Sequence, residues 1–120
     1  MTQAAGGRKP PILINDINRI IHEPARFNIM AYLYVIQSAE FLFIQRQTGL
    51  TWGNLSSHLA KLEKAGYVAV EKEFIGKKPH TMLHLTSEGR TAFDHYRTNM
   101  KKILEYKNSN RKYHHPRVND

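Results

Sequence analysis

Apolar side chains recur every three or four positions after Pro24, where Phe27, Met30, Leu33 and Tyr34 lie on one stripe. This spacing is that of one face of an α-helix, and proline is tolerated in the first helical turn. The pattern therefore predicts a buried helix that begins at Pro24.

Two less regular segments flank this helix. The segment before it, 12–21, is rich in isoleucine, and Asn15 or Asp16 could cap a short helix there. The segment after it, 39–48, is apolar in its first half and polar in its second half. We expect a short extended entry followed by a helix that ends at Gly49, because glycine is common just after a helix.

The next helix has clear signals at both of its ends. Thr51 is a good N-cap, the leucines Leu55, Leu59 and Leu62 form one apolar row, and Gly66 ends the helix. Most of the polar side chains between these leucines lie off the apolar row. The pattern predicts a helix with one buried face and one polar face.

A β-hairpin and a long helix complete the predicted order. Residues 67–75 have the composition of a strand, residues 76–80 that of a turn with two lysines, and residues 81–85 that of a return strand. Thr86 or Ser87 then caps a final helix. The pair of strands is expected to form a hairpin with a basic tip.

The net charge of the chain indicates an anionic partner. The chain has 18 lysines and arginines against 10 acidic residues, which is a formal charge of +8. Nucleic acid is the commonest partner of so basic a domain. Residues 90–117 hold eight basic and two acidic residues, whereas residues 46–80 hold six and three. The excess therefore lies mainly outside the helix that begins at Thr51.

Length and composition restrict the remaining classes. A chain of 120 residues is expected to form one domain, and the absence of cysteine excludes disulfides and thiolate metal sites. Neither a signal peptide nor an apolar run that could span a bilayer is present, so we expect no membrane partner. We divide the chain into a flexible arm at 1–11, one domain at 12–107, and a basic disordered tail at 108–120.

The predicted order of elements is that of a winged helix-turn-helix. We therefore expect an α+β, mainly helical fold with a β-hairpin wing and a long C-terminal helix. Residues 21–30, 48–68 and 85–90 also resemble the small winged-helix DNA-binding regulators related to the MarR and ArsR groups. The middle block is specific, because Gly-Asn-Leu, Ser-x-His-Leu and Leu-Glu-x-Ala-Gly-Tyr follow a helix cap in that order.

This resemblance implies a transcriptional regulator that binds double-stranded DNA sequence-specifically as a homodimer. It implies a prokaryotic, cytoplasmic protein that is nucleoid-associated when bound to DNA. The recognition helix would be about 51–65, lying in the major groove, and the wing about 74–82, lying on the backbone or minor groove. Trp52 departs from the small or acidic residue expected at its position in the family.

The polar residues of these two elements have the chemistry that DNA binding needs. Asn54 can make paired bonds to adenine, hydroxyl groups suit phosphate oxygens, and Gly53 permits close backbone approach. Lysines at a hairpin tip can reach phosphates or the minor groove. The candidate DNA-binding residues are Arg26, Arg46, Thr51, Trp52, Gly53, Asn54, Ser56, Ser57, His58, Lys61, Lys77, Lys78 and His80.

The final helix predicts a second copy of the chain as a partner. Four of its apolar residues step by three, four and three positions, which is the spacing of two helices packed along a seam. The isoleucines near the N-terminus are more numerous than one small domain would be expected to cover. The candidate dimer-interface residues are Ile12, Leu13, Ile17, Ile20, Phe93, Tyr96, Met100, Ile103 and Leu104.

Other functions have weaker support in the sequence. His80 and His84 are four positions apart on one strand, about 13 Å, too far to share one metal ion. No phosphate-binding loop, cysteine nucleophile or paired-carboxylate motif indicates an enzyme or a cofactor. No residue identifies a small-molecule effector. The remaining alternative is a winged helix that binds another protein without specific DNA binding.

Overall fold

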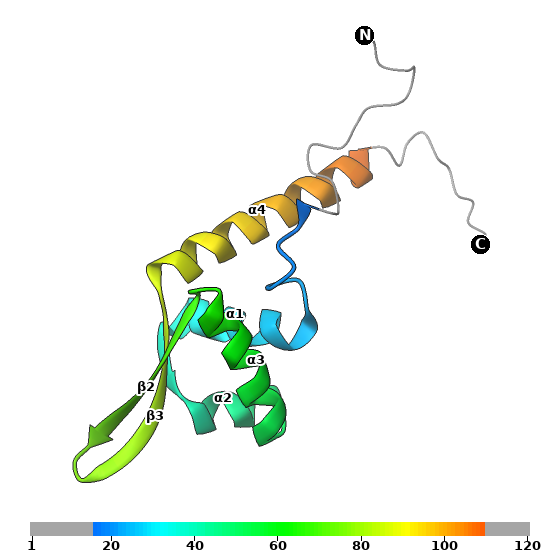
Figure 1. The fold of residues 1–120 in the computed structure, drawn as a ribbon. Helices are drawn as coiled ribbons and strands as arrows, with labels where there is room; N and C mark the ends of the chain where they lie inside the picture. The colour runs from blue at the N-terminus through cyan, green and yellow to red at the C-terminus, as the bar shows by residue number, and fades with distance from the viewer. Residues whose placement is uncertain (1–15, 110–120) are drawn as a thin grey trace. The chain divides into compact units, whose positions relative to one another are not determined.

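A computed structural model of the protein describes residues 16–109 and contains four helices and three strands within that range (Figure 1). The elements are α1 (Pro24–Ile36), β1 (Ser38–Glu40), α2 (Phe41–Thr48), α3 (Trp52–Lys64), β2 (Val68–Ile75), β3 (Lys78–Leu85) and α4 (Ser87–Ser109). The predicted α+β winged helix-turn-helix is confirmed. The predictions for the arm at 1–11, for Ile12 and Leu13, and for most of the tail lie outside the described residues.

The three strands form one antiparallel sheet in the order β1-β3-β2. β1 pairs only with residues 82–84 of β3, so the far end of the β2–β3 hairpin is two-stranded. Figure 1 shows this hairpin extending away from α1, α2 and α3. The turn is shorter than predicted, because β3 already begins at Lys78 and leaves only Gly76 and Lys77 between the strands. Gly76 has a φ of 66°, which a two-residue turn of type II′ requires of its first residue.

Side-chain caps explain where α1 and α3 begin. Glu23 caps α1, since its Oε1 accepts a hydrogen bond of 2.7 Å from the backbone N–H of Arg26. Thr51 caps α3 as predicted, and its Oγ1 accepts from the N–H of Asn54 at 3.1 Å. α2 ends at Gly49, whose φ of 73° is left-handed, also as predicted.

In the segment before α1, where we expected a short helix, residues 12–15 lie outside the described residues and residue 16 is in a 3-10 turn. Residues 17–23 form turns and bends without a helix. The side chain of Asn18 is the reason, because its Oδ1 accepts from the backbone N–H groups of Ile20 (2.9 Å) and Ile21 (3.1 Å). These bonds satisfy two donors that a helix would otherwise use.

The chain divides into two compact units. The first is 18–95, and the described part of the second comprises 16–17 and 96–109, so α4 contributes to both. The core of the first unit consists of side chains from α1, α2, α3 and the sheet, among them Ile29, Met30, Leu33, Ile44, Leu55, Leu62, Val68 and Leu83. All three leucines of the predicted α3 row are buried.

The first turn of α4 lies very close to the backbone that precedes β2. A Cβ built on Gly89 would lie 2.2 Å from the carbonyl oxygen of Tyr67. Thr86 supports the same junction, since its Oγ1 donates to the carbonyl of Gly66 (2.6 Å) and accepts from the N–H of Gly89 (2.9 Å). Gly89 is therefore required by packing. Among the described residues, no helix has the length and apolar character needed to cross a membrane.

Candidate nucleic-acid interface

The face of α3 opposite its buried leucines is polar and exposed. The exposed residues on or beside it include Thr51, Trp52, Gly53, Asn54, Ser56, Ser57, Lys61 and Lys64. This set contains two cations, several hydroxyl groups and one amide. It therefore offers hydrogen-bond donors and acceptors along one helix face while the leucines hold that helix against the core.

Trp52 is the large apolar exception on this face. Its side chain is 61% exposed, yet its ring centroid lies 4.5 Å from that of Phe41, the buried first residue of α2. One side of the indole is thus packed on the domain while the rest faces solvent. This contact restricts the ring, so that Trp52 presents a fixed apolar surface beside the start of α3.

Gly53 has no packing reason within the chain. A Cβ at this position would meet no atom within 4 Å. Gly53 lies in the first turn of a helix, where glycine is less favourable than alanine by up to about 1 kcal/mol. Nothing in the described structure therefore requires a glycine at position 53.

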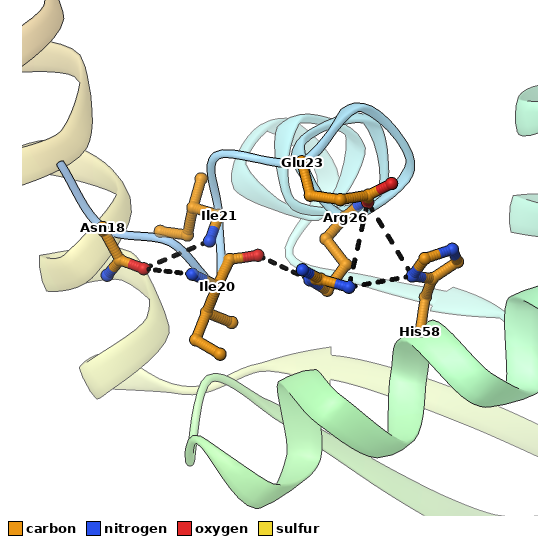
Figure 2. Close-up of polar contacts among 6 residues, drawn as sticks. All are labelled: Asn18, Ile20, Ile21, Glu23, Arg26 and His58. Carbon is orange, nitrogen blue, oxygen red and sulfur yellow. Dashed lines mark hydrogen bonds and ion pairs between the residues drawn. The ribbon is translucent and has the colours of Figure 1, made fainter. Parts of the chain in front are cut away.

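A buried arginine ties α3 to the segment before α1 (Figure 2). The Nε of Arg26 donates to the carbonyl of Ile20 at 2.6 Å, and its Nη1 lies 3.1 Å from Nδ1 of His58 on α3. The carboxylate of Glu23 is 4.0 Å from the same guanidinium and 3.7 Å from His58 Nδ1. Three segments of the first unit therefore meet at one guanidinium.

The sequence predicted that Arg26 contacts a DNA phosphate because it lies at the start of a helix, but the structure buries this residue. Only 9% of the residue is exposed, and its Nε and Nη1 face the carbonyl of Ile20 and the ring of His58. A signal for burial does exist, since Arg26 follows the capping Glu23 by three positions and would lie over it in the first helical turn.

His58 is half-buried by this network and has a defined hydrogen-bonding role. A guanidinium offers only donors, so the bond from Arg26 requires a lone pair on Nδ1 of His58. In the neutral ring the proton then lies on Nε2. The sequence predicted His58 as a DNA contact, and the structure leaves it one N–H for that purpose.

The wing carries the other predicted cations. Lys77 and Lys78 are exposed at its tip, and neither makes an ion pair within residues 16–109. His80 lies further along β3, where its Nδ1 is 2.7 Å from a carboxylate oxygen of Glu40 on β1. The contact with Glu40 makes His80 a link between two strands, unlike the free cations of the tip.

The same face of the sheet holds a second histidine with carboxylates. Nε2 of His84 lies 2.8 Å from Glu73 and 3.6 Å from Glu71, and its Nδ1 lies 2.7 Å from the hydroxyl of Ser38. One ligand atom from each of Glu71, Glu73 and His84 lies within 4.8 Å of the others, a spacing at which three side chains could hold a metal ion. The sequence pairs His84 only with His80 and does not predict this cluster.

Arg46 lies in the last turn of α2, and its side chain is exposed. It borders an open hollow of about 400 Å³ beside β1. The residues that line this hollow are Ile36, Ser38, Ala39, Glu40, Phe43 and Arg46. Arg46 is thus separate from the buried network of Arg26 and is accessible as predicted.

The candidate dimer residues occupy different environments. The ring of Phe93 packs within the chain, 5.7 Å from the ring of Phe27 and 5.0 Å from that of Tyr34. Its burial therefore needs no second copy. Ile17, Tyr96 and Ile103 are also buried in the single chain, Ile20 and Met100 are half-buried, and Leu104 is 62% exposed.

Comparison with known proteins identifies relatives of this fold. An uncharacterized protein of Methanocaldococcus jannaschii is 37% identical over 78 residues, which cover 65% of this chain and 85% of that protein. A transcriptional regulator homologue from Pyrococcus horikoshii OT3 matches with a TM-score of 0.70 and 32% identity, over 73% of this chain and 87% of that one. Reduced AbfR bound to DNA shares the fold at a TM-score of 0.51 and 20% identity, over 72% of this chain and 68% of that one.

The sequence also matches a family model over most of the described residues. The match to the winged helix DNA-binding domain covers residues 25–104, from the start of α1 into the last part of α4. The resemblance to winged-helix regulators that the sequence indicated is thereby confirmed. The chain belongs to the family of winged helix DNA-binding domains.

Proposed function

We propose that this protein is a transcriptional regulator that binds double-stranded DNA sequence-specifically, with α3 in the major groove. The observation that carries the proposal is the division of α3 into a buried leucine row and an exposed polar face that starts at a capped N-terminus. A recognition helix presents its N-terminal residues to base edges. Asn54 and Ser57 lie in that part of α3.

The exposed side chains suggest distinct roles. The amide of Asn54 suits bidentate bonding to adenine, while the hydroxyl groups of Thr51, Ser56 and Ser57 suit phosphate oxygens. His58 offers its Nε2–H toward DNA from the edge of the same face. Gly53 allows a phosphate or a sugar to approach the helix backbone closely, since no atom of the described residues fills the space beside it.

Cations on other elements would bind the DNA backbone. Lys61 lies further along α3, Lys77 and Lys78 at the tip of the wing, and Arg46 at the end of α2. Such contacts supply attraction that does not depend on sequence and that weakens with salt. His80 has a smaller part in this proposal because Glu40 already binds its ring.

The regulator would act as a homodimer. Leu104 is a large apolar side chain that the single chain leaves exposed in α4, and a second copy could cover it. Pairing of two copies would place two recognition helices on half-sites about 34 Å apart, one turn of DNA. Analytical ultracentrifugation tests this part, and a monomer at micromolar concentration would contradict it.

The central test is selection of duplexes from a random pool by the purified protein, followed by affinity measurements at several salt concentrations. Asn54→Ala is expected to cost about 1–3 kcal/mol on the selected duplex and to relax sequence preference. Lys78→Ala is expected to weaken binding to all duplexes alike and to reduce the salt slope by about 0.9 for each of the two subunits of the proposed homodimer.

Three results would contradict the proposal. Failure to enrich any duplex at low salt would refute DNA binding by this protein. Binding without salt dependence would contradict the roles of the lysines. Equal losses for Asn54→Ala on all sequences would refute the assignment of base recognition to Asn54.

A further inference from the structure

The far end of the β2–β3 hairpin exposes two large apolar side chains in succession. Phe74 is 73% exposed and Ile75 is 55% exposed. β1 reaches only residues 82–84 of β3, so no third strand lies beside this end of the hairpin. Because successive side chains of a strand point to opposite faces, Phe74 and Ile75 expose apolar surface on both faces of the hairpin.

Three lysines surround this apolar pair. Lys72 precedes it on β2, Lys77 lies in the turn, and Lys78 is the cross-strand partner of Ile75. All three are exposed, and none forms an ion pair with another described residue. No acidic residue occurs from position 74 to position 80. The tip therefore carries one large apolar side chain on each face of the hairpin, with lysines beside them and with Glu73 between Lys72 and Phe74. Such a tip is complementary to an anionic partner that offers apolar surface on both sides of it.

We propose that Phe74 and Ile75 form an apolar wedge that enters the DNA minor groove at a base step and partly unstacks it, while the lysines bind the flanking phosphates. The inference rests on the proposed function, which supplies duplex DNA as the partner. Phenylalanine and isoleucine are among the side chains that other proteins insert between base pairs from the minor groove. The sugars that line this groove supply the apolar surface.

The dimensions of the hairpin support a wedge over simple contact with an undistorted groove. Paired strands lie about 4.8 Å apart between their backbones, and the minor groove of B-DNA is about 6 Å wide. A hairpin tip with two large side chains therefore needs a widened groove. Insertion at a base step kinks the duplex toward the major groove and opens the minor groove. The two-residue turn at Gly76 and Lys77 keeps the tip narrow enough to enter.

A wedge would add sequence preference without hydrogen bonds to bases. Pyrimidine–purine steps unstack more easily than other steps, so the energy of insertion depends on the step beneath the tip. The protein would then favour such a step at a fixed distance from the bases that α3 reads. This preference would depend on Phe74 and Ile75 and would be independent of Asn54.

The test compares the wild-type protein with a Phe74→Ser/Ile75→Thr double variant on the duplex that the wild type selects from a random pool. That duplex carries 2-aminopurine at successive positions, because its fluorescence rises when a base unstacks. The wild type is expected to raise the fluorescence at one step. The double variant is expected to bind at least about tenfold more weakly, from the loss of apolar burial, with an unchanged salt slope and no fluorescence rise.

Two control variants separate the wedge from other effects. Val35→Thr removes an apolar group that is 81% exposed on α1, and it is expected to leave affinity and fluorescence unchanged. Lys78→Ala is expected to reduce the salt slope and to keep the fluorescence rise. Circular dichroism and the urea unfolding midpoint establish that each variant is folded.

The possible outcomes either support or overturn the inference. If the wild type binds its selected duplex without a fluorescence rise at any step, the wedge is refuted and the proposed function stands, whatever the variants do. Equal affinity of the double variant and the wild type also refutes it. If no duplex is enriched, the proposed function itself fails. Tighter binding to phosphatidylserine vesicles than to DNA, lost in the double variant, would assign the tip to a membrane surface and overturn the wedge.

Discussion

Replacement of Arg26 by methionine tests whether the buried network holds α3 in place. Methionine is unbranched and fills most of the same space, but it cannot donate to the carbonyl of Ile20 or to Nδ1 of His58, which are 2.6 Å and 3.1 Å from the guanidinium. Hydrogen bonds from a charged group contribute about 1.5–3 kcal/mol each, and a buried acceptor left alone costs about 1–3 kcal/mol.

The two lost bonds would cost about 3–6 kcal/mol if nothing compensated for them. Both contacts are only partly buried, so water can reach part of the vacated site, and the apolar side chain recovers some burial energy. We therefore expect Arg26→Met to lower the free energy of unfolding by about 2–4 kcal/mol. For a domain of this size that corresponds to a fall in melting temperature of about 8–25 °C.

Urea denaturation followed by far-ultraviolet circular dichroism measures this difference. Arg46→Met is the matched control, because Arg46 is exposed and its replacement is expected to change stability by no more than about 0.5 kcal/mol. Arg26→Lys keeps the charge without the planar fork and is expected to fall between the wild type and Arg26→Met. If Arg26→Met unfolds within about 0.5 kcal/mol of the wild type, the network does not stabilise the domain and the reasoning is refuted.

Three further substitutions follow from packing and burial. Gly53→Ala is expected to stabilise the fold by about 0.5–1 kcal/mol and to weaken DNA binding, and unaltered affinity would contradict a close approach to DNA. Gly89→Ala is expected to destabilise by about 1–3 kcal/mol because its Cβ would collide with the carbonyl of Tyr67, and wild-type stability in urea would rule this out. Burial raises the pKa of the Tyr96 hydroxyl above 10.0. The folded state therefore holds the hydroxyl proton more tightly than the unfolded state does, and the protein loses stability as the pH rises above 10.0. Tyr96→Phe is expected to reduce this loss of stability at alkaline pH, as measured by urea denaturation at successive pH values. The same loss of stability in the variant and the wild type would contradict the role of Tyr96.

Local signals in the sequence were sufficient for most of the fold. Thr51 and Gly49 have side-chain and backbone preferences that determine where a helix begins or ends, and both act as predicted. The leucine row of α3 is buried because its spacing matches the helical period. The predicted turn at Gly76 is longer than the observed one. Lysine and proline are common in turns, but Lys78 and Pro79 pair with β2 and so belong to β3.

Contacts between distant segments were harder to predict. The carbonyl of Ile20 is a buried acceptor only because Asn18 turns the chain before α1, and His58 reaches the same place from a helix 32 positions after Arg26. No spacing rule connects these residues. The spacing of Phe93 predicts an intermolecular seam, and it gives no sign that this ring packs on Phe27 and Tyr34 of the same chain.

Several of the proposed backbone-binding cations lie away from the proposed base-reading groups. Asn54 and Ser57 are uncharged residues of α3, whereas Lys77 and Lys78 are at the wing tip. Salt dependence comes from cations that release counterions, while base choice comes from oriented hydrogen-bonding groups. Mutation is therefore expected to separate the two properties. The net charge of +8 indicates that DNA attracts the protein, but it contains no information about which sequence is bound.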